Sequence, residues 1–311
     1  MTKINIILEF QHFIAELKNL FSVRTDIYKI FLKNKKLFWW FIIVLLLNST
    51  QQISLITYKP IYSIIGILFQ FIMQAFFILF CCSNFVERIL RKCESVRRVA
   101  TKTEKERLYS LFQEVYQKAL SENSLIGKDV RLYIVDSMEI NAFIIGRNTL
   151  VLTRGALKML NDDELKGIMA HEFGHLSNFD GVITILINFC TTIYLLFFAI
   201  INVLLTYLER EFNNTLFSSL CGIVNQIIQL PVKILYLISI LFISGGSRKS
   251  EYRADYYACK LGYQEQLKRA LYKLYNIQVS DRKRGLIENL ERTHPMLAYR
   301  IERFEDIVTT E

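Results

Sequence analysis

The chain has 311 residues, 52% of them hydrophobic, and a formal net charge of +9. Its basic residues form no aromatic-interleaved stripe, which argues against a nucleic-acid-binding protein, and its six cysteines form no CxxC pair, which argues against a cysteine metal site. The charges are spread unevenly, because several long stretches carry none at all, and this pattern indicates a membrane protein.

The first 82 residues predict an amphipathic segment followed by two transmembrane helices. Residues 1–36 have apolar side chains at helical spacing, and they fit a helix on the membrane surface and a solvated helical extension equally well. Residues 37–58 and 61–82 each hold 22 residues without a charge, enough for a helix to cross about 30 Å of hydrocarbon. We therefore expect a membrane domain at 37–82.

A second pair of apolar runs lies further along the chain. Residues 182–208 form an uncharged run of 27 residues, and residues 223–243 form a weaker run that contains Lys233 and Pro231. Each apolar side chain of the weaker run favours insertion by about 0.3 to 0.6 kcal/mol, and a central lysine opposes it by about 3 kcal/mol. Summed over the run, the free energy narrowly favours insertion. The two runs predict a transmembrane hairpin at 182–243, which makes four spans in all.

The distribution of Lys and Arg predicts which side of the membrane each segment faces. The segments 1–36, 83–181 and 244–311 contain 7, 15 and 13 of these residues, whereas the connections 48–60 and 209–215 contain one each. This asymmetry predicts that both termini and both long polar blocks face the cytoplasm. Five basic residues after the second span are candidates for contacts with anionic lipid headgroups: Arg88, Arg91, Lys92, Arg97 and Arg98.

The two cytoplasmic blocks, 83–181 and 244–311, are together long enough for one catalytic domain, which the membrane hairpin interrupts. Residues 130–136 alternate between apolar and polar as a strand does, and residues 148–153 form a second β-rich run. We therefore expect an α+β domain with a small β-sheet.

The helix that follows these strands carries the clearest motif of the chain, HEFGH. The helix begins after Asn161, an N-cap residue with acidic residues in the next turn, and we expect it to end near Ser177. His171 and His175 project from one helix face about one turn apart, so both imidazoles can bind a single zinc ion, and Glu172 lies beside them as a general base. We predict one Zn²⁺ per chain.

A zinc site of this kind needs a third protein ligand, and the second cytoplasmic block offers Glu251. Glu251 and Asp255 lie four residues apart on one face of a predicted helix, which suits a ligand and a second carboxylate that orients a ligand histidine. The alternative is a surface glutamate paired with Arg248 or Lys249. The ligand role requires Glu251 to lie on the same side of the membrane as His175, which holds only if both hairpin runs cross or neither does. Because the run at 182–208 is expected to cross, we expect the run at 223–243 to cross too.

His294 lies in the segment THPMLAYRI, residues 293–301. We predict that His294 donates a hydrogen bond to the oxyanion that forms during peptide hydrolysis, a role that Arg300 could share. The alternatives are a histidine at a helix start without a catalytic task, and an arginine that pairs with a carboxylate.

Four segments together resemble the HtpX-type integral-membrane zinc peptidases, relatives of the CAAX prenyl endopeptidases. The segments are HEFGH, SRKSEYRAD at 247–255, NAF at 141–143 and THPMLAYRI. The resemblance extends over residues 130–303 and includes the placement of two spans before the catalytic domain and two inside it. One departure is that about 36 residues precede the first span.

The resemblance implies a mostly α membrane protein with a zincin-like catalytic domain. It assigns His171, His175 and Glu251 as the zinc ligands and Glu172 as the general base. It also implies that the strand at 148–153 pairs with an extended polypeptide substrate and that the NAF segment borders the cleft. The substrate-binding residues expected on this basis are Asn141, Ala142, Thr149, Leu150 and Val151.

The activity implied by the resemblance is proteolytic quality control of membrane or misfolded proteins. The enzyme would be a multi-pass protein of the bacterial plasma membrane whose catalytic domain faces the cytoplasm. Three alternatives remain open: a CAAX-type prenyl-protein endopeptidase, a catalytically silent membrane scaffold, and a transporter. Against a transporter, the predicted spans hold almost no ionisable residue besides Lys233.

Overall fold

The computed structural model describes residues 83–123, 126–127, 129–212, 218–220, 222–226, 249–278 and 297–308, with single positions at 216 and between 61 and 81. The predicted segment 1–36, the span 37–58 and His294 lie outside the described residues, as do most of the span 61–82 and most of the run 223–243. The described part is mostly helical with one small mixed sheet, as predicted for the catalytic domain.

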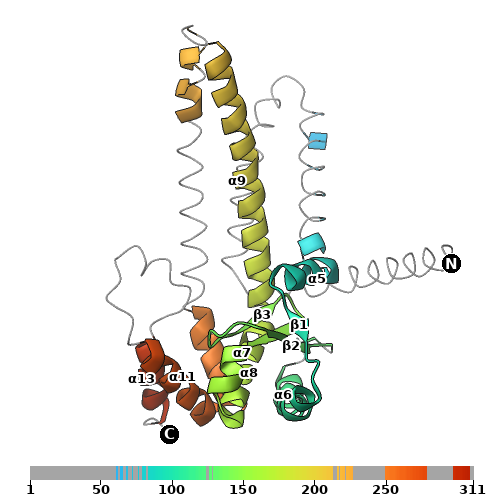
Figure 1. The fold of residues 1–311 in the computed structure, drawn as a ribbon, viewed down its shortest axis with the longest axis vertical. Helices are drawn as coiled ribbons and strands as arrows, with labels where there is room; N and C mark the ends of the chain where they lie inside the picture. The colour runs from blue at the N-terminus through green and yellow to red at the C-terminus, as the bar shows by residue number, and fades with distance from the viewer. Residues whose placement is uncertain are drawn as a thin grey trace, which may run out of the picture.

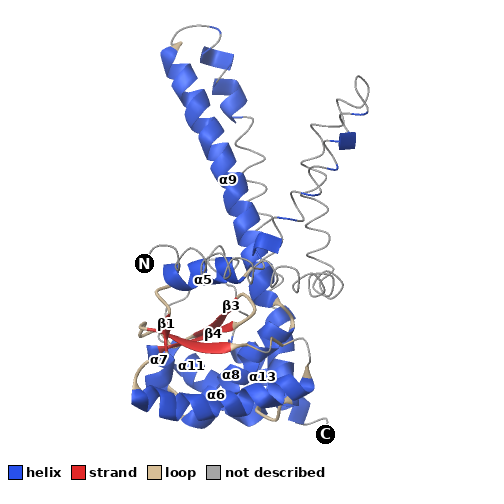
Figure 2. Cartoon of the chain, turned by 90° about the vertical axis from the view of Figure 1, so that its right-hand side faces the viewer, coloured by secondary structure: helices blue, strands red, loops and turns tan. Residues whose placement is uncertain are grey.

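The sheet has four strands in the order β1-β2-β4-β3 and lies between α5 on one side and the larger helices on the other (Figure 2). β2 and β4 run parallel, and the two edge strands pair antiparallel with their neighbours. The predicted strands at 130–136 and 148–153 are confirmed, and the edge strand β3 begins within the NAF segment. The strand bounds are β1 Arg97–Arg98, β2 Arg131–Val135, β3 Ala142–Ile145 and β4 Thr149–Thr153.

β4 is the central, fully buried strand of the sheet. All five of its residues are buried. Leu150 and Leu152 join the main hydrophobic core beneath the sheet, whereas Val151 packs with Tyr133 and Ile145 on the opposite face. Apolar side chains on both faces are typical of a strand that has neighbours above, below and on both edges.

Helix α8, Asp162–Ser177, runs through the centre of the helical layer and confirms the predicted helix. Its capping box joins Asn161 and Glu164, since the side chain of each accepts a hydrogen bond from the backbone N–H of the other at 2.8 Å. The ring of Phe173 on this helix is fully buried and packs against Phe112 and Tyr116 of α6. The helices around α8 are α6 Lys102–Glu122, α7 Arg154–Met159, residues 249–260, α11 Gln264–Gln278 and α13 Leu297–Val308.

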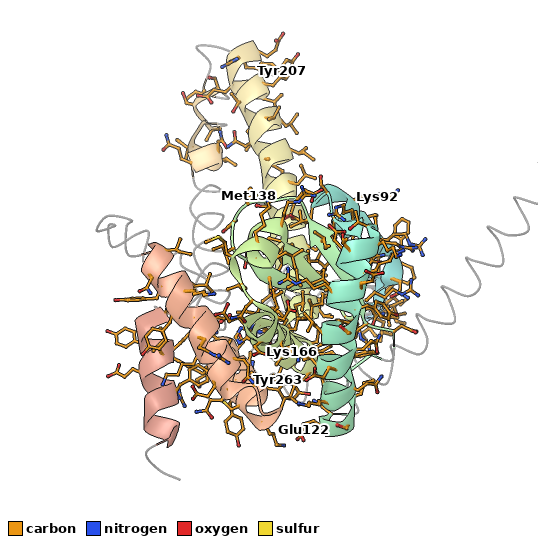
Figure 3. All side chains as sticks on the ribbon, turned by 60° about the horizontal axis from the view of Figure 1, so that its bottom comes forward. Lys92, Glu122, Met138, Lys166, Tyr207 and Tyr263 are labelled. Atoms are coloured by element: carbon orange, nitrogen blue, oxygen red, sulfur yellow. The ribbon has the colours of Figure 1, made fainter. Side chains whose placement is uncertain are left out.

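A polar cluster joins three of these helices at the surface (Figure 3). Glu114 of α6 lies 2.7 Å from Lys166 Nζ of α8 and accepts a hydrogen bond of 2.8 Å from the hydroxyl of Tyr263, which directly precedes α11. These contacts join the middle of α6 to the N-terminal part of α8 and to the start of α11.

Two further helices, α5 Asn84–Cys93 and α9 Asp180–Glu211, lie at the opposite side of the sheet from α6 and α11. α9 follows α8 closely and extends far beyond the domain (Figure 1), and Tyr207 marks its outer part (Figure 3). Within the part of the chain that the structure describes, no helix combines the length and the apolarity that a membrane crossing requires. The four spans remain predictions.

Candidate metal centre

Helix α8 brings the two histidines of HEFGH together inside the domain. His171 and His175 are 5% and 9% exposed, and their Nε2 atoms lie 3.2 Å apart. The two rings are nearly perpendicular, with an interplanar angle of 87° and centroids 4.8 Å apart. Two ring nitrogens therefore point at one small volume, as the four-residue spacing predicts.

The third predicted ligand, Glu251, reaches the same volume from the helix at residues 249–260. Its Oε2 atom lies 3.3 Å from Nε2 of His171, and its Oε1 atom lies 3.4 Å from Nε2 of His175. The side chain is only 2% exposed, so the alternative of a surface glutamate is wrong.

A glycine permits the helix of Glu251 to approach α8 so closely. A Cβ atom at Gly174 would lie 2.6 Å from Cα of Ala254, a distance that real Cβ contacts do not show. Any larger residue at position 174 would push apart the two helices that carry the three ligand side chains.

The three side chains fit a zinc ion in both chemistry and spacing. Two imidazoles and one carboxylate, with a fourth position open, form a ligand set that catalytic zinc sites use. Two atoms bound at about 2.0–2.1 Å to a tetrahedral zinc lie about 3.3–3.4 Å apart. The two Nε2 atoms lie 3.2 Å apart, and the approaches of the Glu251 carboxylate to them, through Oε2 to His171 and Oε1 to His175, are 3.3 and 3.4 Å, close to that separation.

The other ring nitrogen of each histidine lies against a carboxylate. Nδ1 of His171 is 2.9 Å from Oδ1 of Asp255, the partner predicted from the sequence. Nδ1 of His175 is 2.9 Å from Oδ2 of Asp180, a residue that the sequence analysis missed. A carboxylate on Nδ1 holds the proton there and leaves the lone pair of Nε2 for a metal ion.

Arg300 neutralises the carboxylates behind the ligands. Its Nη1 lies 2.9 Å from Oε2 of Glu251, and its Nε and Nη2 donate to the two oxygens of Asp255 at 2.9 and 2.6 Å. Arg300 is 5% exposed, so its guanidinium group is committed to these pairs. Of the two roles considered from the sequence, pairing with carboxylates is therefore the one that the geometry supports.

The site as a whole favours positive charge. Burial lowers the pKa of both imidazoles, and the charge of Arg300 lowers that of His171 further. Asp255 and Glu251 raise the pKa of His171, and Asp180 and Glu251 raise that of His175, so that both pKa values lie above the ordinary value. A metal ion bound here would displace the protons that the ligand nitrogens otherwise hold.

Glu172 lies next to the ligand pair. It is 6% exposed, and one of its carboxylate oxygens lies within 4.8 Å of a ring nitrogen of each histidine. A carboxylate at this distance can take a proton from a small molecule held between it and the metal position, which is the geometry that a general base needs.

The expected substrate residues divide between two strands. Thr149, Leu150 and Val151 lie in β4, where they are fully buried and where the strand is paired on both edges. No backbone edge is left for a substrate, so the prediction for these three residues is wrong. Ala142 is the first residue of β3, an edge strand whose first three residues are partly exposed, and Asn141 directly precedes it.

Comparison with known proteins gives a consistent result. The model of a family described as Peptidase family M48 matches residues 103–308. The chain is 30% identical over 197 residues to a protein of Tropheryma whipplei (strain Twist) named "Protease HtpX homolog", an alignment that includes 57% of this chain and 66% of that relative. It is 32% identical over 195 residues to a protein of the same name from Streptococcus uberis, with 56% of this chain and 66% of the relative aligned.

The chain therefore aligns with slightly less than two thirds of the length of these relatives. Among solved structures, the crystal structure of S. mikatae Ste24p matches with a TM-score of 0.44 and 21% sequence identity, over 91% of this chain and 65% of that chain.

Proposed function

Since the chain belongs to peptidase family M48, we propose that it is a zinc metalloendopeptidase that hydrolyses internal peptide bonds of polypeptides. The observation that carries the proposal is the convergence of Nε2 of His171, Nε2 of His175 and the carboxylate of Glu251, with separations of 3.2 to 3.4 Å. Together with Glu172 beside them, these side chains supply the ligands and the base that metal-assisted hydrolysis needs.

The chain's own residues divide the work of the reaction. His171, His175 and Glu251 would hold the ion, which when bound polarises the scissile carbonyl and makes a water molecule more acidic. The carboxylate of Glu172 accepts the proton of the attacking water and passes it to the amine that leaves. Asp255 keeps the imidazole of His171 in the tautomer that can bind metal.

Stabilisation of the oxyanion needs a further hydrogen-bond donor. The sequence offers His294 and Arg300 for this role. Because Arg300 is paired with Glu251 and Asp255, we propose His294 as the donor.

The proposed substrate contact is backbone pairing along β3. This strand is the edge of the sheet on the side of α8, which carries the ligand histidines. An extended polypeptide that adds to this edge would form main-chain hydrogen bonds, and these depend little on sequence. Broad specificity for extended or unfolded segments follows, with Asn141 and Ala142 at the border of the cleft.

We further propose that the enzyme works at the cytoplasmic face of a bacterial plasma membrane and cleaves membrane or misfolded proteins. The support is the uncharged run at 182–208 and the apolar side chains on α9 that are exposed by 61 to 69%, namely Leu196, Ile200 and Val203. Apolar surface of this extent needs an apolar partner, and lipid is one that the run's composition suits.

The contacts of helix α5 and the residues after it reduce the number of basic side chains that are candidates for contact with lipid. Phe85 and Ile89 on its outer face are 47% and 43% exposed, and Lys92 is exposed close to them. Arg91, by contrast, donates to Thr149 and Glu87, and Arg97 pairs with Glu104 and Asp136. Two of the five basic residues expected to contact lipid are thus committed to protein partners.

The experiment that tests the proposed activity compares wild type with Glu172→Gln on unfolded casein. We expect wild type to cleave, a chelator to stop cleavage, added zinc to restore it, and Glu172→Gln to retain zinc but lose at least about 100-fold in rate. Glu265→Gln, at an exposed position of α11, is the matched control. Zinc-loaded wild type without cleavage would instead support the silent scaffold.

A further inference from the structure

Asp180, the first residue of α9, contacts both halves of the candidate metal centre. Its Oδ2 atom lies 2.9 Å from Nδ1 of His175 on α8. Its Oδ1 atom lies 3.4 Å from Nη2 of Arg253, which belongs to the helix that carries Glu251. The side chain is 16% exposed, so one largely buried carboxylate faces groups from both sides of the predicted hairpin.

The contact with His175 exists only because the chain turns sharply between α8 and α9. In an uninterrupted helix, residues five positions apart point about 140° away from each other around the axis, so a carboxylate at 180 could not reach the ring at 175. Here α8 ends at Ser177 and α9 begins at Asp180, with two residues between them. The turn brings the carboxylate back over the histidine.

The turn is held in a conformation that a large residue rarely adopts. Phe179 has a φ of 61°, in the left-handed region, at a cost of about 1 to 3 kcal/mol. Its side chain is 2% exposed and belongs to a small core cluster with Val182 and Leu186, while Asn178 Nδ2 donates to the carbonyl of Gly174 at 2.8 Å. Packing and hydrogen bonds thus fix the turn and, with it, the position of Asp180.

The carboxylate of Asp180 also lies at a helix terminus. Asp180 occupies the first turn of α9, where the unpaired backbone N–H groups favour negative charge. A charged acceptor on Nδ1 fixes the ring orientation and tautomer and raises the basicity of Nε2, the atom that points towards Nε2 of His171 and the carboxylate of Glu251.

We propose that Asp180 is a positioning residue of the metal centre, through which the N-terminus of α9 fixes the imidazole of His175. The inference rests on the proposed function, since it concerns the affinity of the same site for zinc. One consequence follows for the structure. A shift of the first turn of α9 should change the affinity for metal even when none of the ligand residues is substituted. Because Arg253 contacts the same carboxylate, the helix of Glu251 is aligned with that turn.

The experiment measures zinc affinity of the full-length protein by competition with a chromogenic chelator, with activity as a separate readout. We expect Asp180→Asn to bind zinc about 10 to 100 times more weakly than wild type. Asp163→Asn is the matched control, because it makes the same change at an exposed residue in the first turn of α8 and removes the same interaction with a helix terminus. Helix content of the metal-free protein should be the same for both variants.

The ratio of the zinc affinities of the two variants decides the outcome. A zinc affinity of Asp180→Asn within threefold of Asp163→Asn overturns the proposal and leaves the proposed function intact, whereas a wild type that binds no zinc overturns the proposed function itself. Should Asp180→Asn not fold, Asp180→Glu is measured in the same way, since it keeps the charge and displaces the carboxylate by one methylene. A tenfold loss in that variant supports positioning, and unchanged affinity contradicts it.

Discussion

The carboxylate of Glu251 lies 3.4 Å from Nε2 of His175, although the two residues are 76 positions apart in the chain. Between them run α9 and the segment expected to complete a membrane hairpin. The short distance requires both ends of this insertion to return to one place, as the zinc-ligand interpretation of the sequence demands. The described start of this insertion, Asp180 of α9, lies 2.9 Å from Nδ1 of His175, so the end of the insertion next to α8 is in contact with the metal centre.

Arg300 should be essential for stability because it compensates two buried carboxylates. Replacement of Arg300 by Met leaves Glu251 and Asp255 without their cation, and we expect the free energy of unfolding to fall by about 3 to 5 kcal/mol in the metal-free protein. Denaturant titration measures this loss. Arg300→Lys should recover only part of it, because an ammonium group cannot make the two-pronged contact with Asp255. A loss no larger than that of the exposed Arg269→Met would contradict this role.

Gly174→Ala should weaken metal binding through helix spacing alone. The added methyl group would lie 2.6 Å from Cα of Ala254, so the helix of Glu251 must move away from α8. We expect a stability loss of about 1 to 3 kcal/mol and a measurable drop in zinc affinity. Gly167→Ala is the matched control, since its methyl group would lie 2.4 Å from the backbone of Leu267 in α11, away from the ligands. Equal zinc affinity in the two variants would be evidence against the spacing argument.

Substrate pairing along β3 predicts an alternating response to backbone methylation. In antiparallel pairing, every second residue of the added strand directs its N–H towards the edge. Single N-methyl groups walked along a cleaved peptide, with the scissile amide left unmodified, should lower kcat/KM about tenfold at alternate positions and leave the positions between within about twofold. A uniform response along the peptide would argue against β-augmentation.

The ion pair between Glu104 and Arg97 predicts a pH-dependent contribution to stability far from the metal centre. The hydrogen bonds from Arg97 lower the pKa of Glu104 to about 2. Because the folded pKa lies below the unfolded value, the contribution is complete above about pH 4.5 and is lost as the pH falls towards 2. Glu104→Gln, which keeps the capping box, should therefore be less stable than wild type at pH 7, and the difference should shrink on acidification.

Denaturant titrations at pH 7, 4 and 3 follow this difference. Glu106→Gln provides the control, since its carboxylate lies 3.8 Å from Lys102 and its side chain is 65% exposed. The prediction fails if the gap between Glu104→Gln and wild type has the same size at every pH.

Local patterns in the sequence predicted two strands of the sheet and the helices that carry the candidate metal centre. The capping residues around Asn161 gave the start of α8, and the four-residue spacings gave the faces on which His171 and His175, and Glu251 and Asp255, meet the metal position. Such patterns suffice because they depend only on helix geometry. The metal chemistry then joins two segments that the sequence alone leaves far apart.

Two features could not be read locally. Strand order depends on tertiary pairing, so the sequence does not show that the strand at 148–153, to which the resemblance assigns the substrate, is an inner strand. Its consecutive Leu150, Val151 and Leu152 are nevertheless typical of a strand buried on both faces. The role of Asp180 depends on the left-handed backbone of Phe179, and no residue preference marks a phenylalanine for that conformation.

Zinc content tests the central claim most directly. Elemental analysis of the purified protein, followed by titration of zinc into the metal-free form, should give about one zinc per chain for wild type and a loss of stable binding for Glu251→Ala, with helix content unchanged. Wild-type protein that binds no zinc, or a Glu251→Ala variant that binds it as tightly as wild type, would contradict a metal centre built from His171, His175 and Glu251.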